Sequence, residues 1–293
     1  SDWNDIRTNP DKPLINRYIQ GKYIPGSIVK MITQIALLKS QHFNKEVKQY
    51  CPGFYQFGDR IFGCWYTEGH GELNVTEAMA VSCDVYFYKT VKQLNLRDLN
   101  RTFNDFGFGQ KTKIDIPNET VGLVPDSEYM RKRYGKYGWS KGVLLNLAIG
   151  QGELLVTPMQ VLNYVNLLAT KGEAPNCHFV FVDNLPLNTS PNLEHKIWDN
   201  VHKGMRDAII SKNGTGKKAD INVKGFDLYG KTGTAENPHG DNHAWFVGWA
   251  DYNNEKYSIV ILLENAGSGG SVAAPMAKKV FSKLILGNDI VLK

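Results

Sequence analysis

The chain has 293 residues, a formal net charge of +5, and 42% hydrophobic against 22% charged residues. This length can bury a full core, as one large domain or two lobes, and the balance is ordinary for a globular protein. Basic residues form no block and do not alternate with aromatic ones, which excludes nucleic acid as a partner, and no apolar run approaches the roughly 20 residues of a membrane span.

The predicted elements of the first part of the chain are an extended lead-in, a hairpin region and three helices. Segment 1–26 is polar and interrupted by three prolines, which predicts an extended conformation. An apolar stretch after a Pro-Gly turn predicts a helix over 27–39, and turn signals predict loops and a hairpin over 49–71. Apolar periodicity then predicts helices over 76–94 and 96–106.

The second part of the chain is predicted to change from helices to strands. Segment 111–137 is loop-rich, and a Thr-Pro start predicts a helix over 157–170, followed by an amphipathic helix over 197–210. Three strands and a closing helix are predicted at 226–234, 244–250, 257–263 and 272–286. Helices in the middle and an antiparallel sheet near the end predict an α+β protein with a helical lobe against a sheet.

Three short motifs follow one another in the order of a serine acyl-transfer site. They are S-x-x-K at 27–30, S-x-D at 82–84 and K-T-G at 231–233. A lone serine is a poor nucleophile, and the motifs can supply the base, the oxyanion site and the substrate anchor that it needs. Each motif alone is weakly specific, since S-x-x-K arises about once by chance in such a chain. The interpretation therefore depends on their order and context.

The S-x-x-K motif has a favourable context. Ser27 opens the predicted helix 27–39, where its hydroxyl lies near the positive end of the helix dipole. The spacing of three residues places Lys30 on the same helix face, within reach of Ser27. The alternative is that Ser27 is only an N-cap and Lys30 only an exposed helix lysine.

Beyond the motifs, the chain resembles the class B penicillin-binding proteins, and among them the elongation-type branch called penicillin-binding protein 2. The resemblance extends from about Asp2 to Phe281 and is carried by seven segments: 23–27, 69–71, 82–88, 148–152, 157–158, 231–236 and 243–246. It implies the penicillin-binding/β-lactamase-like transpeptidase fold, a mainly antiparallel sheet with flanking helices and a helical lobe. A single transpeptidase domain over 1–293 is expected.

The resemblance also implies what this sequence lacks. The family's membrane anchor, its pedestal domain and the opening strand of its transpeptidase domain are expected to lie outside this chain. The full-length protein is expected at the periplasmic face of the inner membrane, with this chain itself soluble.

The implied activity is a peptidoglycan D,D-transpeptidase that cross-links stem peptides during cell elongation, without a catalytic cofactor. Ser27 would attack the penultimate D-alanine of a stem peptide ending in D-Ala-D-Ala, and β-lactams would acylate the same hydroxyl. The expected partners are therefore stem peptides and β-lactams, together with a membrane glycosyltransferase of the elongation machinery.

The resemblance assigns a role to each further motif residue. Lys30 would take the proton of the nucleophile, which requires a neutral amine, and burial beside a second cation, Lys231, favours that state. Ser82 would relay a proton to the leaving group, because a hydroxyl both donates and accepts. Asp84, in place of the commoner asparagine, would hold Lys30 but would also favour its charged form.

The K-T-G segment would bind the substrate. Lys231 with the hydroxyls of Thr232 and Thr234 suits a terminal carboxylate, and Gly233 would let the strand approach the ligand. The backbone N–H groups of Ser27 and Thr234 would form the oxyanion hole.

Two other functions share the three motifs. A serine β-lactamase or D,D-carboxypeptidase would pass the acyl group to water, although the sequence indicates no deacylating glutamate. A non-catalytic β-lactam sensor domain would keep the same residues.

A second constellation consists of three cysteines and a histidine. Cys51, Cys64, His70 and Cys83 are separated by 13, 6 and 13 positions and flank predicted turns or the S-x-D motif. Cys₃His is a closed tetrahedral zinc set, which indicates a structural metal site. The alternatives are a Cys51–Cys64 disulfide, which an oxidising compartment favours, or independent thiols. Cys177 is expected to be unpaired.

Overall fold

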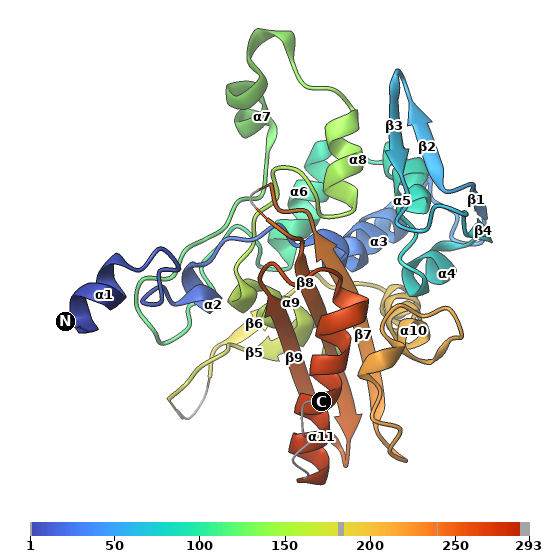
Figure 1. The fold of residues 1–293 in the computed structure, drawn as a ribbon. Helices are drawn as coiled ribbons and strands as arrows, with labels where there is room; N and C mark the ends of the chain where they lie inside the picture. Colours follow the sequence, from blue (N-terminus) through green and yellow to red (C-terminus); the bar gives the residue numbers. More distant parts are fainter. Residues whose placement is uncertain (1, 181–184, 239, 288–293) are drawn as a thin grey trace.

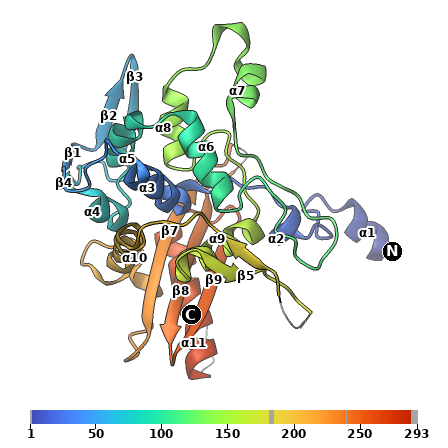
Figure 2. The same ribbon diagram turned by 180° about the vertical axis from the view of Figure 1, so that it is seen from behind.

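The computed structural model describes residues 2–180, 185–238 and 240–287. It contains a three-stranded sheet and a helical lobe, joined along the sheet face that α9 and α10 cover (Figures 1 and 2). The α-helices are α1 Asp2–Thr8, α2 Arg17–Gln20, α3 Lys30–Lys39, α4 Val75–Ala80, α5 Asp84–Thr90, α6 Leu96–Asp105, α7 Ser127–Tyr134, α8 Gly142–Ala148, α9 Pro158–Ala169, α10 His195–Ile210 and α11 Ala274–Leu286. The strands are β1 Gln49–Cys51, β2 Phe54–Phe57, β3 Arg60–Gly63, β4 Gly71–Leu73, β5 Glu173–Pro175, β6 Leu187–Thr189, β7 Asp227–Ala235, β8 His243–Tyr252 and β9 Glu255–Leu263.

The sheet has the antiparallel order β7-β8-β9, which confirms the three predicted strands. Its register places Lys231 opposite Val247 and Gly233 opposite Trp245. The β8–β9 hairpin turns at Asn253 and Asn254, whose φ angles of 51° and 63° suit the tight primed turns of such hairpins.

Strand β8 is buried on both sides because helices cover both faces of the sheet. Trp245 and Trp249 pack into the main core with the helical lobe, whereas Phe246 packs with Phe281 of α11 in a second core. Figure 1 shows α11 in front of the sheet, and α9 and α10 lie on the opposite face (Figure 2). The strand is therefore apolar along nearly its whole length.

Helix α3 runs through the helical lobe and is buried from Lys30 to Leu37. It packs against α6 and α10, which explains why the helix has no exposed face along this stretch. Helix α9 begins at Thr157 with a capping box and Pro158 in the first turn, as the Thr-Pro start predicts.

Four predictions of local structure need correction. Segment 1–26 contains the short helices α1 and α2, and the start of the predicted helix 27–39 is the 3-10 turn η1 (Gly26–Val29). Segment 111–137 contains α7, and 76–94 is not one helix, because the chain breaks at Ser82 between α4 and α5.

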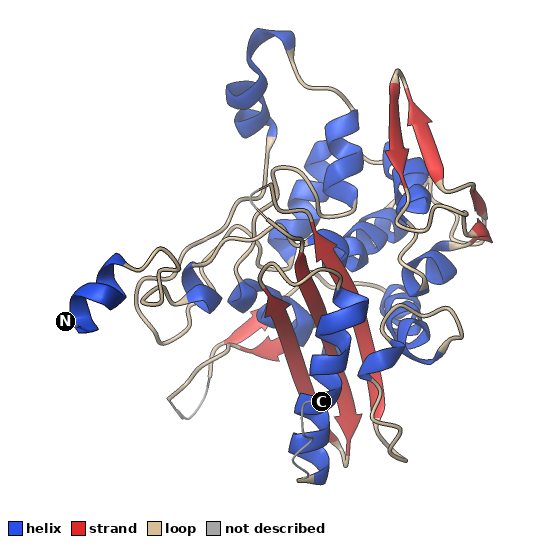
Figure 3. Cartoon of the chain, in the orientation of Figure 1, coloured by secondary structure: helices blue, strands red, loops and turns tan. Residues whose placement is uncertain are grey.

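The hairpin region predicted over 49–71 is present as two small antiparallel pairs. Strand β1 pairs with β4, and β2 pairs with β3 (Figure 3). Over the described ranges, none of the helices combines the length and the apolar character that a membrane span needs.

Candidate active site

The S-x-x-K motif lies where three segments of the backbone pass close together, at Gly26, Gly150 and Thr234. Gly26 has a φ of 58°, and its N–H donates to the carbonyl of Gly150 at 2.9 Å. A Cβ atom at Gly26 would lie 2.6 Å from the carbonyl oxygen of Thr234, and one at Gly150 would lie 2.1 Å from the carbonyl oxygen of Gly26. Because only glycine fits these approaches, they fix the turn that carries Ser27 against strand β7.

Lys30 is fully buried and connects this turn to the S-x-D motif. Its Nζ donates to Asp84 Oδ1 at 2.7 Å and to the carbonyl oxygen of Ser82 at 2.8 Å, and it lies 3.3 Å from Ser82 Oγ. A buried ammonium needs such partners, and the Asp84 carboxylate supplies the compensating charge.

Ser82 lies at the break between α4 and α5 in an unusual conformation. Its φ of 56° is in the left-handed region that residues with a Cβ rarely adopt. Cys83 caps the start of α5, and its Sγ accepts from the N–H of Tyr86. The break turns both the hydroxyl and the carbonyl of Ser82 toward Lys30, which a continuous helix would not allow.

Lys231 approaches Ser82 from the sheet. Its Nζ donates to Ser82 Oγ at 2.7 Å and to the carbonyl oxygen of Thr232 at 2.9 Å. Complete burial, and secondly the charge of Lys30, lower the pKa of the Lys231 amine well below its usual range. The Ser82 hydroxyl therefore bridges the two amines, and the Asp84 carboxylate pairs with that of Lys30.

The remaining K-T-G residues line the edge of β7. Thr232 Oγ1 donates to Thr215 Oγ1 at 2.8 Å, and Thr234 Oγ1 accepts from the N–H of Gly269 at 3.3 Å. A Cβ at Gly233 would lie 2.8 Å from Ile28 Cγ2. Glycine is thus needed here to pack β7 against the turn that carries Ser27, a role that the sequence alone did not indicate.

The structure brings one or more residues of each motif into direct contact, namely Lys30, Ser82, Asp84 and Lys231, and it adds contacts from residues outside the motifs. Gln151 Nε2 donates to the carbonyl oxygen of Thr234 at 3.3 Å. The second oxygen of Asp84 accepts from the backbone N–H of Trp65 at 3.0 Å. The only sequence signal for Gln151 is its place in segment 148–152, and Trp65 and Thr215 had none.

The four predicted metal ligands also converge. The ligand atoms of Cys51, Cys64, His70 and Cys83 all lie within 4.8 Å of one another. His70 Nδ1 is 3.7 Å from Cys51 Sγ and 3.5 Å from Cys64 Sγ, close to the roughly 3.6 Å expected between sulfur and nitrogen ligands of tetrahedral zinc. The cysteines are free thiols in the structure, so the donor set and its geometry fit a zinc ion.

The electrostatics of this Cys/His cluster favour a thiolate at Cys64 and oppose a second one at Cys83. The hydrogen bond with Cys83 lowers the pKa of the Cys64 thiol, and the same contact raises the pKa of Cys83, because two adjacent thiolates repel each other. A cation among the four ligands would remove that repulsion.

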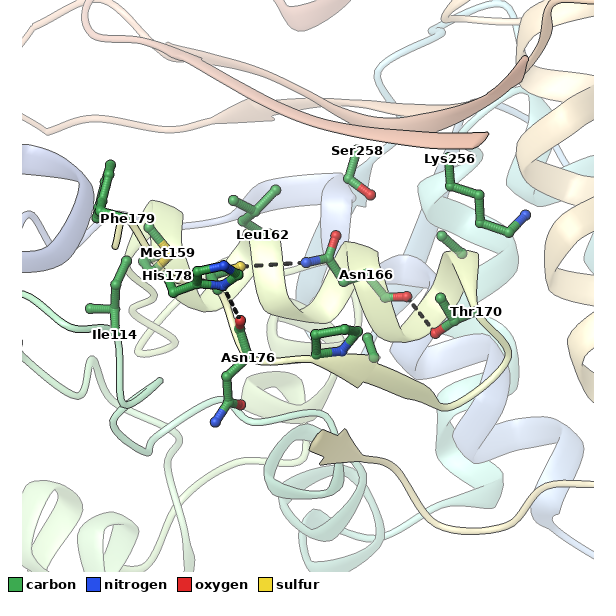
Figure 4. Close-up of a pocket in the computed structure, with 14 residues that line it drawn as sticks. Ile114, Met159, Leu162, Asn166, Thr170, Asn176, His178, Phe179, Lys256 and Ser258 are labelled. Atoms are coloured by element: carbon green, nitrogen blue, oxygen red, sulfur yellow. Dashed lines mark hydrogen bonds between the residues drawn. The ribbon is translucent and has the colours of Figure 1, made fainter. Parts of the chain in front are cut away.

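A separate cavity of about 480 Å³ lies between α9, β5 and β9 (Figure 4). Its lining is mainly apolar, and Asn166 donates to Cys177 Sγ within it. Burial raises the pKa of the Cys177 thiol to about 11, which makes it a poor nucleophile at neutral pH. None of the three motifs contributes to this cavity.

Fold and motif order define the class of the protein. An antiparallel sheet whose first strand carries K-T-G, packed against a lobe that carries S-x-x-K at a helix start, is the penicillin-binding transpeptidase fold. Residues 2–282 match the family described as the penicillin binding protein transpeptidase domain, and the chain belongs to that family.

Individual relatives agree with this assignment. The chain is 31% identical to the peptidoglycan D,D-transpeptidase MrdA of Haemophilus influenzae, over 95% of this chain and 47% of that protein. It is similar to the structure of Pseudomonas aeruginosa PBP2 in complex with WCK 5153, with a TM-score of 0.88 and 33% identity, over 100% of this chain and 65% of the other. The chain is also similar to the structure of the complex between the penicillin-binding protein PBP2 and MreC from Helicobacter pylori. The TM-score is 0.86 and the identity 34%, over 96% of this chain and 53% of the other. The chain spans about half the length of the curated relatives that it matches.

Proposed function

We propose that this chain is the catalytic domain of a peptidoglycan D,D-transpeptidase that cross-links stem peptides during cell elongation and is acylated by β-lactams at Ser27. The observation that supports this proposal best is the Ser82 hydroxyl, which lies 2.7 Å from the amine of Lys231 and 3.3 Å from that of Lys30. Such a bridge provides the proton path that an acyl transfer at a serine requires.

The charge balance of the site suggests how the base is made. Asp84 compensates one ammonium, so one of the two buried amines can be neutral without leaving an unpaired carboxylate. Because burial and the charge of Lys30 lower the pKa of Lys231, we assign the neutral amine of the free enzyme to Lys231. Transfer of a proton from Lys30 through Ser82 Oγ would leave Lys30 neutral and Lys231 charged. A substrate carboxylate beside Lys231 would favour this transfer.

In the proposed acylation step Ser27 Oγ attacks the carbonyl carbon of the penultimate D-alanine. Lys30 accepts the hydroxyl proton, and the N–H groups of Ser27 and Thr234 stabilise the oxyanion. The new ester bond replaces the peptide bond, and the departing D-alanine amine takes a proton by way of Ser82. An amine of a second stem peptide then attacks the ester and completes the cross-link.

The partners and location of the full-length protein belong to the same proposal. Relatives that share this domain include a PBP2 whose structure holds MreC and a peptidoglycan synthase complex that coordinates polymerisation and cross-linking. We therefore place the domain at the periplasmic face of the inner membrane, next to a glycosyltransferase.

We also propose that Cys51, Cys64, His70 and Cys83 hold a structural zinc ion. His70 Nδ1 faces two of the thiols at 3.7 Å and 3.5 Å, which suits an imidazole that binds the metal through Nδ1. When bound, the metal would supply a cross-link between the β1–β4 pair and the start of α5. With four protein ligands it has no open position for catalysis.

Intact-mass spectrometry after incubation with benzylpenicillin tests the proposed enzyme. The expected result is one adduct on the wild-type protein and on Ser190→Ala, a serine from a chance S-x-N triplet, and none on Ser27→Ala. An adduct on Ser27→Ala would refute the nucleophile assignment. Rapid turnover of a chromogenic cephalosporin would identify a β-lactamase instead.

A further inference from the structure

Trp65 lies next to the strained serine of the site without belonging to any of the three motifs. It follows β3 directly after Cys64, and its side chain is 57% exposed. An exposed indole adds little to the core, so its hydrogen bonds define its role better than its packing does.

Two hydrogen bonds from Trp65 reach the chain on either side of Ser82. The indole Nε1–H donates to the carbonyl oxygen of Val81 at 3.0 Å, and the backbone N–H donates to Asp84 Oδ2 at 3.0 Å. Val81 ends helix α4, where carbonyl groups lack helical partners and need donors from elsewhere. One residue thus holds both ends of the segment 81–84.

The backbone of this segment is strained at Ser82. Ser82 keeps a φ of 56° although it carries a Cβ, and it is buried. Such a conformation persists only where surrounding contacts impose it. Because both the carbonyl and the hydroxyl of Ser82 bind Lys30, relaxation of this backbone would move both groups away from the amine.

We propose that Trp65 is a positioning residue that holds Ser82 and Asp84 in the arrangement required for proton transfer. The proposal rests on the function proposed above and adds a residue outside the motifs. It also explains the aspartate of the S-x-D motif: Lys30 donates to one carboxylate oxygen and Trp65 to the other. An asparagine offers only one acceptor oxygen and would leave one of these donors unsatisfied.

Rapid-mixing kinetics with a fluorescent penicillin test this role, because they separate the dissociation constant of the initial complex from the first-order acylation rate. Trp65→Phe keeps a ring but removes the donor to Val81. We expect about a tenfold lower acylation rate with a dissociation constant changed less than twofold. Tyr66→Leu is the matched control, because the Tyr66 ring also contacts His70 but makes no bond around Ser82.

A double-mutant cycle with Ser82→Ala separates positioning from a general structural effect. If Trp65 acts through Ser82, Trp65→Phe lowers the acylation rate by a smaller factor in Ser82→Ala, which keeps the carbonyl but lacks the hydroxyl, than in the wild type. Equal losses in both backgrounds, or a loss confined to the dissociation constant, would overturn the proposal. Circular dichroism checks folding, and Trp65→Leu replaces Trp65→Phe if the latter does not fold. A wild-type protein without any adduct would contradict the proposed function itself, whereas an acylated Trp65→Phe with wild-type rate contradicts only this inference.

Discussion

The Asp84 carboxylate accepts hydrogen bonds from both Lys30 and the backbone N–H of Trp65, and a substitution that removes one acceptor should therefore impair the site. Asp84→Asn keeps the size of the side chain but removes the negative charge and one acceptor. We expect a 10- to 100-fold lower acylation rate by penicillin, because a charge-assisted hydrogen bond is worth about 1.5–3 kcal/mol. Asp105→Asn, which removes a partly exposed partner of Lys39, is the control and should leave the rate unchanged. A wild-type rate in Asp84→Asn would contradict the role of the carboxylate.

At the scale of residues, the sequence indicated the candidate reactive groups but not the groups that hold them. Ser27, Lys30, Ser82 and Lys231 carry a local motif, and the structure brings the motifs together. Trp65, Gln151 and Thr215 contact these groups from distant segments, and no spacing in the sequence encodes such contacts. A motif indicates local chemistry, whereas the residues that position its side chains are brought there by the tertiary fold.

At the scale of elements, the close approach of the Gly26 and Gly150 backbones allows a direct test of packing. Gly150 has a φ of 76° and no room for a Cβ, whereas Gly152 has a φ of 81° and a nearest neighbour at an ordinary 3.5 Å. We expect Gly152→Ala to lower the free energy of unfolding by about 1 kcal/mol through backbone strain alone. Gly150→Ala adds a backbone clash, so it should cost about 3 kcal/mol or more and also impair acylation.

Chemical denaturation and penicillin labelling of the two alanine variants measure this difference. Equal losses of stability in both would mean that the crossing tolerates a side chain. In that case the turn at Ser27 would not depend on this contact.

Helix α10 carries a histidine that links stability to pH. His202 lies against Trp249 and bonds the carbonyl of Leu168, and burial lowers the pKa of its imidazole below the ordinary 6.5. Between the folded pKa and 6.5 the unfolded chain therefore binds more protons than the folded one. The free energy of unfolding must fall as the pH decreases through this window, and the contribution is fully present above pH 6.5.

Thermal unfolding between pH 7.5 and 5 tests this dependence. The midpoint should fall below pH 6.5 and should fall less steeply in His202→Gln, whose amide can still donate to Leu168. His195→Gln, an exposed histidine of the same helix, should follow the wild type. A steeper fall in His202→Gln would show that the sign is wrong.

The elements that the sequence predicted best are those with strong local patterns. The three strands and α9 agree with their predicted ranges, because alternation and the Thr-Pro cap are local signals. The segment 76–94 was predicted as one helix because its apolar periodicity continues through Ser82. Tertiary contacts break the helix there, and periodicity cannot report them.

At the scale of the whole molecule, the Cys/His cluster ties the hairpin region to the helix that bears the S-x-D motif. A zinc ion bound there would add its binding free energy to folding. We expect about one zinc per chain by elemental analysis and a lower unfolding midpoint after chelation. Cys51→Ser should lose the metal and the same stability, whereas Cys177→Ser, outside the cluster, should keep both. A thiol count of two in the denatured, unreduced protein would support the Cys51–Cys64 disulfide instead.

The α+β class and the arrangement of lobe and sheet were predictable for the whole molecule, because the order of helical and strand patterns along the chain reports them. The cores on the two faces of the sheet were not predictable. They require knowing that α9 and α10 cover one face and α11 the other, and this depends on how segments distant in the sequence pack.

The bond between Lys231 and Ser82 joins residues 149 positions apart. At synthesis rates of about 5–20 residues per second, Ser82 is added to the chain roughly 7–30 s before Lys231. A nascent chain therefore contains Ser27 and Lys30 long before Lys231 is present to complete the site. Fragments that end before β7 are expected not to react with penicillin. Penicillin labelling would consequently count only molecules whose translation and folding are finished.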